Sequence, residues 1–130
     1  MTHAIRWIAV VALLTAGTAE AADFDGSKKL ICAPVKAMDC AEGVECVSGT
    51  PQDLGAPTFI RIDFDRKEVA GTQRTTKIRE FDKSATQVLL QGVEAGLGWT
   101  IAINSGTGRM HATMAGLEGA IILSGSCTTL

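Results

Sequence analysis

The sequence predicts an all-β fold, a small antiparallel meander that closes into a barrel or sandwich and is stapled by disulfides. From Phe59 onward, apolar and polar residues alternate with period two, which is typical of half-buried strands. Turn residues interrupt the alternation about every ten residues, and no long segment shows helical periodicity. Closure is expected because an open meander would leave exposed strand edges that invite aggregation.

Residues 1–21 have the features of an export signal. A short basic start and an apolar core ending near Ala16 precede Ala19 and Ala21, the small residues of an A-x-A cleavage site. The apolar run is much shorter than the ~20 residues that a spanning helix needs. We therefore expect cleavage rather than a membrane anchor, and a mature chain of residues 22–130 that forms one domain without a membrane span. The expected location is periplasmic or secreted.

The chain has four cysteines, an even set that predicts two disulfides in an oxidising compartment. The C-x7-C-x5-C spacing of the first three differs from the paired spacing of zinc sites, which disfavours a metal site, and a reactive thiol pair is a further alternative. The favoured pairs are Cys40–Cys46, which closes a short loop containing Gly43, and Cys32–Cys127. The second pair would join the first strand to the last, where a meander barrel closes. Pairing of Cys127 with Cys40 or Cys46 stays open.

The N-terminal third is less regular than the remainder. Residues 28–35 predict a first strand that Pro34 ends or confines to a sheet edge. Residues 38–48 read as a loop bounded by cysteines. Thr50 and Pro51 resemble the N-cap and first position of a one-turn helix.

The remaining elements follow from alternation and turn residues. Inward-facing sets are expected in several strands, such as Trp99, Ile101 and Ile103 in one strand. Gly106 and Gly108 mark a hairpin turn because glycine tolerates the positive φ of such turns. The expected strands cover residues 59–64, 68–71, 75–81, 86–93, 99–104, 109–115 and 120–127.

Composition excludes some classes of function. The chain has 12 Lys and Arg against 14 Asp and Glu, a net charge of −2, and these charges are interspersed. Without a basic stripe, nucleic acid is a poor candidate partner. Tyrosine is absent and Trp99 is the only tryptophan after the signal, so the chain has few of the aromatic residues that form binding hot spots for a partner protein.

The acidic residues give weak signals of chemistry. Asp39, Glu42 and Glu45 could ligate calcium but lack the D-x-D-x-D-G order of a calcium loop, so a solvated acidic loop is favoured. Asp63 and Asp65 could act as paired carboxylates on a glycoside, but at a strand end they favour solvent. We predict no metal site, no cofactor and no enzymatic activity.

Three residues are possible contacts for a ligand or partner: Trp99, Arg109 and His111. Alternation points His111 outward beside Arg109, and no G-x-S-x-G element offers a nucleophile, so a surface histidine is favoured over a catalytic one. Trp99 follows a Gly-rich turn and either lines the mouth of the barrel or plugs one end of the core. The Gly-rich stretches lack phosphate-binding spacing and are interpreted as turns.

Several segments together resemble a family of small exported proteobacterial proteins with four cysteines and no assigned function. The resemblance covers most of residues 22–130 and implies that the cysteines are a family framework and that the host is Gram-negative. It carries no catalytic residues. The segments are Phe24–Lys28 with Leu30–Ala33, Asp39-Cys40 with Cys46, Gly49–Pro51, Pro57, Arg74–Thr76, Leu90–Val93, Gly98-Trp99 and Gly125–Cys127.

The sequence therefore favours a non-enzymatic exported domain that binds an envelope protein or a small ligand. The alternative, by analogy of size and architecture with small periplasmic barrels, is an inhibitor of a secreted or envelope hydrolase such as a lysozyme or protease. An interior cavity lined by Trp99, Ile101 and Met110 would favour a small ligand. A projecting, rigid Cys40–Cys46 loop over a solid core would favour a protein partner.

Overall fold

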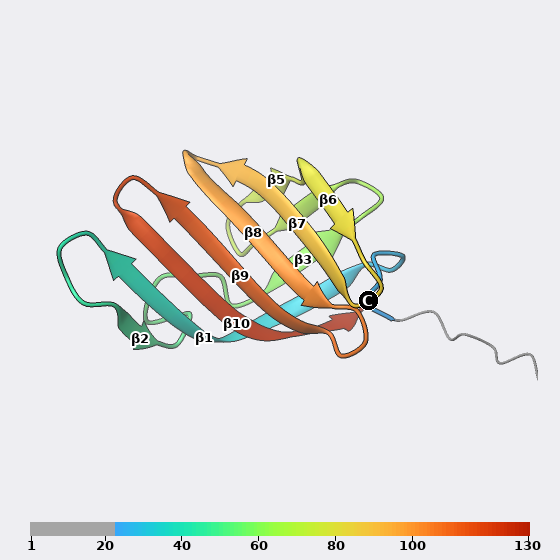
Figure 1. The fold of residues 1–130 in the computed structure, drawn as a ribbon, viewed down its shortest axis with the longest axis horizontal. Coiled ribbons are helices and arrows are strands. Elements are labelled where there is room, and N and C mark those ends of the chain that lie inside the picture. The colour runs from blue at the N-terminus through green and yellow to red at the C-terminus, as the bar shows by residue number, and fades with distance from the viewer. Residues whose placement is uncertain (1–22) are drawn as a thin grey trace, which may run out of the picture.

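A computed structural model describes residues 23–130, which form ten antiparallel strands in one curled sheet (Figure 1). The predicted export signal lies outside the described residues, so its cleavage stays a prediction. Within residues 23–130, no helix has the length and apolar character needed to cross a membrane. The strands are β1 (Leu30–Ala41), β2 (Val47–Gly49), β3 (Ile60–Asp63), β4 (Glu68–Ala70), β5 (Thr75–Lys77), β6 (Glu80–Lys83), β7 (Gln87–Glu94), β8 (Leu97–Asn104), β9 (Arg109–Gly116) and β10 (Gly119–Thr129).

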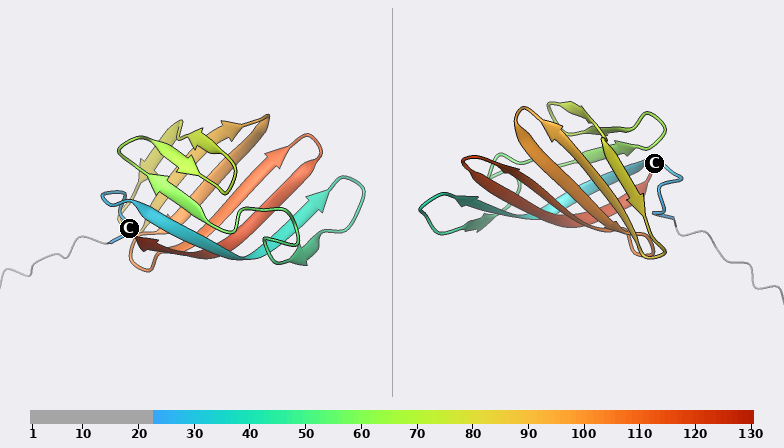
Figure 2. Two further views of the ribbon diagram at one scale, coloured as in Figure 1. Left: turned by 180° about the vertical axis from the view of Figure 1, so that it is seen from behind. Right: turned by 45° about the horizontal axis from the view of Figure 1, so that its top comes forward.

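The sheet curls into a half-barrel, which confirms the predicted fold class (Figure 2). Its strand order is β5-β4-β3-β1-β10-β9-β8-β7-β6, and β2 pairs with β1 beside this path. The two end strands, β5 and β6, are consecutive in the chain. The Thr76 hydroxyl of β5 donates to the Val93 carbonyl of β7 at 3.3 Å, so the two ends of the sheet meet at a seam between β5 and β7.

The core lies on the concave face of the sheet and is formed by the inward half of each alternation. The predicted inward residues Ile101, Ile103 and Met110 are all buried. Ile60 and Ile62 of β3 are buried as well, whereas Arg61 between them is exposed. Burial of such a face is the main favourable contribution to folding.

β1 differs most from its prediction, because it continues through Pro34 and lies in the middle of the sheet. Cys32 of β1 pairs with Cys127 of β10, and the Cys127 N–H points away from β1 and donates to the Gly108 carbonyl. The backbone N–H of Cys32 therefore points away from β10, and Pro34, two residues later in the strand, has the same orientation. The missing Pro34 N–H therefore faces the flank of β1 between its pairings with β3 and β2. No ladder bond is lost there, and Val35 forms a bulge directly afterwards.

Two other predicted segments also differ. Residues 38–48 are a hairpin of β1 and β2 closed by Cys40–Cys46, not an irregular loop. The strand expected at residues 75–81 is split at Ile78 and Arg79 into β5 and β6, which lie at opposite ends of the strand order, and Ile78 between them is buried. The helical turn after Thr50 forms as predicted, with the Asp53 N–H donating to Thr50 Oγ1 at 3.3 Å.

Both predicted disulfides are confirmed: Cys32–Cys127 links β1 to β10, and Cys40–Cys46 links the ends of the β1–β2 turn. Two disulfides indicate folding in an oxidising compartment. The long disulfide lies at the centre of the sheet order, where β1 and β10 pair along their lengths. The prediction that this disulfide lies where the barrel closes is therefore wrong, because the bond is in the middle of the sheet and not at the seam.

Two ion-paired aspartates attach the N-terminal segment to the sheet. Asp25 accepts hydrogen bonds from the Ser27 N–H and from Lys83 Nζ, both at 3.0 Å, and these hold the pKa of Asp25 well below its usual range. Asp63 lies 2.9 Å from Lys29 Nζ and accepts the Arg66 N–H, and the pKa of Asp63 is lowered by these contacts.

These lowered pKa values predict acid sensitivity. A carboxyl group whose pKa is lower in the folded state stabilises the fold above its unfolded pKa, and this contribution is lost as the pH falls below about 4. We expect Asp25→Asn/Asp63→Asn to reduce the fall in unfolding free energy between pH 5 and pH 2.5, measured by urea unfolding. Asp65→Asn, in the exposed β3–β4 turn, is the control and should leave that fall in place. A double variant with the pH dependence of the parent would contradict the prediction.

Candidate functional site

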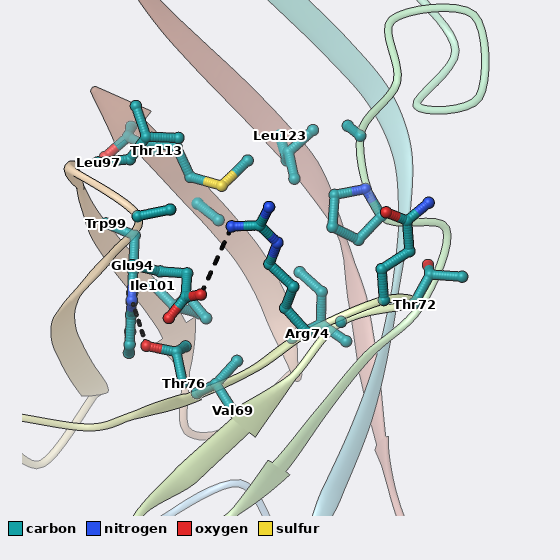
Figure 3. Close-up of a pocket in the computed structure, with 18 of the residues that line it drawn as sticks. Val69, Thr72, Arg74, Thr76, Glu94, Leu97, Trp99, Ile101, Thr113 and Leu123 are labelled. Atoms are coloured by element: carbon teal, nitrogen blue, oxygen red, sulfur yellow. Dashed lines mark hydrogen bonds and ion pairs between the residues drawn. The ribbon is translucent and has the colours of Figure 1, made fainter. Parts of the chain in front are cut away.

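A cleft of about 650 Å³ opens at one end of the half-barrel, between β4–β5 and the strands β8, β9 and β10 (Figure 3). Its floor is apolar and is formed by buried side chains from five strands. These residues are Ile60, Val69, Ile101, Ala112 and Leu123. A cleft of this size with an apolar floor is typical of sites that take small molecules.

Two tight turns form opposite parts of the rim. In the β7–β8 turn, Ala95 and Gly96 both have positive φ, 49° and 83°, as a two-residue hairpin turn of type I′ requires. This turn sets Glu94 directly opposite Leu97, and both residues line the cleft. In the β4–β5 turn, the Gly71 N–H donates to the Arg74 carbonyl at 2.8 Å, which fixes the base of Arg74.

Trp99 forms part of the wall and also holds the seam of the half-barrel. Its ring lies over Gly92, the residue directly opposite on β7, where a Cβ atom would overlap the indole. The Trp99 Nε1–H donates to Thr76 Oγ1 at 3.4 Å, and the Thr76 hydroxyl donates to the Val93 carbonyl at 3.3 Å. Trp99 is 7% exposed, so it offers a ligand an apolar surface rather than a hydrogen-bond donor.

Arg74 and Glu94 are the charged residues of the lining. Arg74 Nη1 lies 3.7 Å from Glu94 Oε1, a separation beyond ordinary hydrogen-bond length. Their side chains are 64% and 38% exposed, so the pair is solvated and contributes little to stability. In Figure 3 the Arg74 side chain extends from the β4–β5 turn into the space between the labelled residues.

The three predicted contact residues are not brought together. Trp99 and Ile101 line the cleft, whereas Met110 is fully buried and does not line it. Arg109 and His111 lie on the outer, exposed face of β9, where His111 Nδ1 is 3.1 Å from Ser124 Oγ. Trp99 therefore has both roles that the sequence allowed, and contacts of Arg109 and His111 with a partner stay predictions.

The acidic clusters lie away from the cleft. Asp39, Glu42 and Glu45 are exposed at the β1–β2 hairpin, and within residues 23–130 no three His, Cys, Asp or Glu side chains gather as a metal site. Asp63 is engaged by Lys29, while Asp65 is exposed in the following turn.

Sequence reasoning missed the rim residues Arg74, Glu94 and Leu97. Each belongs to a turn or strand end, where polar and exposed residues are expected in any protein. The one available signal was Gly92 inside a strand, since a glycine in that position marks a close approach of another group.

No family model, curated protein or solved structure matches the chain. The resemblance to small exported proteins with four cysteines therefore stays a hypothesis, and any inference about function rests on the geometry of the cleft.

Proposed function

We propose that this protein is a non-enzymatic binding domain, located in the periplasm or secreted, that takes a small and mainly apolar ligand into the cleft. The observation that carries the proposal is the apolar cleft itself, with buried Ile101 and Leu123 in its floor and Trp99 in its wall. Water in contact with such a surface is released when an apolar ligand enters, which favours binding.

The charged groups of the cleft also support binding rather than catalysis. The titratable side chains in its lining are Arg74 and Glu94, which lie next to each other as an ion pair. A general acid–base mechanism would favour two groups with separate roles facing a reacting atom. The apolar floor instead provides surface area for a ligand.

Leu97 and Val93 provide a matched test of the cleft. They lie on the same hairpin and are 42% and 43% exposed, but only Leu97 lines the cleft. We expect the fluorescence of Trp99, the only tryptophan after residue 21, to change saturably when decanol is added. Leu97→Asn should weaken this binding about fivefold, because part of the apolar wall is replaced by an amide that loses water on ligand entry.

Val93→Asn is the control for that titration and should bind decanol like the parent protein. Calorimetry with the same ligand checks that the fluorescence change reports binding. If decanol fails to bind, or if both variants bind it equally well, the ligand-binding proposal is wrong.

A second candidate function is recognition of a protein, such as inhibition of an envelope hydrolase. The observation that favours it is the β1–β2 hairpin, which extends from the end of the half-barrel (Figure 1) and is cross-linked by Cys40–Cys46. Val44 and Val47 are 67% and 58% exposed on this hairpin. A rigid loop with exposed apolar residues loses little conformational entropy on binding. Hydrolase inhibition that is lost in Val44→Asp but kept in Leu97→Asn would support this candidate.

A further inference from the structure

We propose that the ligand of the cleft is a carboxylic acid on an apolar body, and that Arg74 binds its carboxylate. The inference rests on the proposed function, because it names the chemical class of ligand for the same cleft. It is carried by the position and incomplete pairing of Arg74 at the rim.

Arg74 has hydrogen-bonding capacity that the protein does not use. A guanidinium group has five N–H donors in a planar fork. Within residues 23–130 the Arg74 side chain donates no hydrogen bond, and its contact with Glu94 is a single ion pair of 3.7 Å. The side chain nevertheless extends into the cleft, among the residues that line it (Figure 3).

A carboxylate fits these donors better than Glu94 does. Carboxylates bind guanidinium groups through two parallel N–H···O bonds, which the distance between Arg74 and Glu94 precludes. Glu94 lies at the last position of β7 with a half-exposed side chain, so water can solvate it when a ligand takes its place. Thr72 and Gln73, on the same turn as Arg74, also line the cleft and offer further donors.

The apolar floor then holds the body of the acid. Ile101, Ala112 and Leu123 lie on β8, β9 and β10, beneath the rim on which Arg74 stands. An amphiphilic acid can therefore place its carboxylate at the solvated rim and its apolar part in the floor.

Three probes that have the same number of carbon atoms in one alkyl chain but different head groups test the inference: decanoate, decanol and decylamine. At neutral pH we expect decanoate to bind about tenfold more tightly than decanol, and decylamine to bind less tightly than either. Arg74→Gln should remove the preference for decanoate and leave decanol binding unchanged. Glu94→Gln should strengthen decanoate binding severalfold, because it removes the competing carboxylate.

Arg61→Gln is the matched control, because Arg61 is an exposed arginine on the outer face of β3. This substitution changes the net charge by the same amount as Arg74→Gln. It should keep the preference for decanoate. N-acetyl-trileucine and its C-terminal amide extend the test to a peptide body. Tighter binding of the acid than of the amide would show that the carboxylate is recognised on either body.

The outcomes separate this inference from the proposed function. If decanol binds but decanoate binds no better, or if Arg74→Gln affects both probes equally, the role of Arg74 is wrong and the apolar cleft remains a binding site. Preferential binding of decylamine would also overturn the inference, because Glu94 would then be the recognition group. If none of the probes binds, both proposals are wrong.

Discussion

Replacing Cys32 and Cys127 together with alanine is expected to lower the free energy of unfolding by about 4–5 kcal/mol. The two cysteines are 95 residues apart in sequence, so their bond restricts almost the whole unfolded chain. Cys40 and Cys46 are 6 residues apart, and the same loop-entropy reasoning gives about 2 kcal/mol for Cys40→Ala/Cys46→Ala. Typical domains are stable by about 5–15 kcal/mol, so only the first variant approaches the unfolding threshold.

The position of the long disulfide refines this expectation. Cys32 and Cys127 face each other within a ladder in which β1 and β10 pair from Leu30 to Ala41, so the folded topology does not depend on their bond. The loss should therefore come mainly from the unfolded state, which becomes less compact without the cross-link. Urea unfolding should show a lower midpoint together with a steeper dependence on urea.

Alanine is the appropriate replacement for this pair because Cys32 and Cys127 are 0% and 8% exposed. A buried serine would add the cost of an unpaired hydroxyl and confuse the comparison. Equal midpoints for the two double variants would contradict the loop-entropy account. Loss of the β-sheet signal in circular dichroism of the Cys32→Ala/Cys127→Ala variant under native conditions would contradict the claim that the β1–β10 ladder maintains the fold without the disulfide.

The strands that sequence predicted well are those with one buried and one exposed face. Trp99, Ile101 and Ile103 of β8 are buried in strict alternation, so the period of two was directly readable. Pro34 shows why β1 was harder. Whether proline is tolerated depends on which flank of the strand lacks a partner, and this is set by where β2 and β3 pair with it.

The cleft could not be predicted because its residues come from turns that are distant in sequence. Pro57, Arg74 and Glu94 belong to three separate connections or strand ends, and no spacing relates them. They come together only because the sheet curls until β5 meets β7. The disulfides could be predicted, in contrast, because an even set of cysteines leaves few pairings and the short loop favoured one of them.

The largest expected effect outside the disulfides is that of Gly92→Ala. A Cβ atom at this position would overlap the Trp99 ring and lie 2.7 Å from the Lys77 carbonyl oxygen. Trp99 would have to move, and its hydrogen bond to Thr76 at the seam would be lost. We expect an increase in Trp99 exposure and a loss of about 2–3 kcal/mol of unfolding free energy, as in other overpacked cores.

Gly98→Ala is a closely matched control for this substitution. Gly98 precedes Trp99 on β8, and the nearest atom to an added Cβ there is the Ala115 carbonyl oxygen, 4.0 Å away. The control should change stability little, because it introduces the same methyl group on the open outer face of the sheet. The comparison is made by urea unfolding, with the emission maximum of Trp99 followed in each variant.

A double variant assigns the cost of Gly92→Ala to its two contacts. Trp99→Phe has a smaller ring and no N–H group, so it should relieve the overlap with the new methyl group while leaving the Lys77 carbonyl in place. We therefore expect Gly92→Ala to cost less in the Trp99→Phe background than in the parent, a coupling typical of residues in direct contact. An equal loss of unfolding free energy in both backgrounds would show that the steric overlap is with the Lys77 carbonyl. The Trp99 ring would then not be the reason that β7 requires a glycine at position 92.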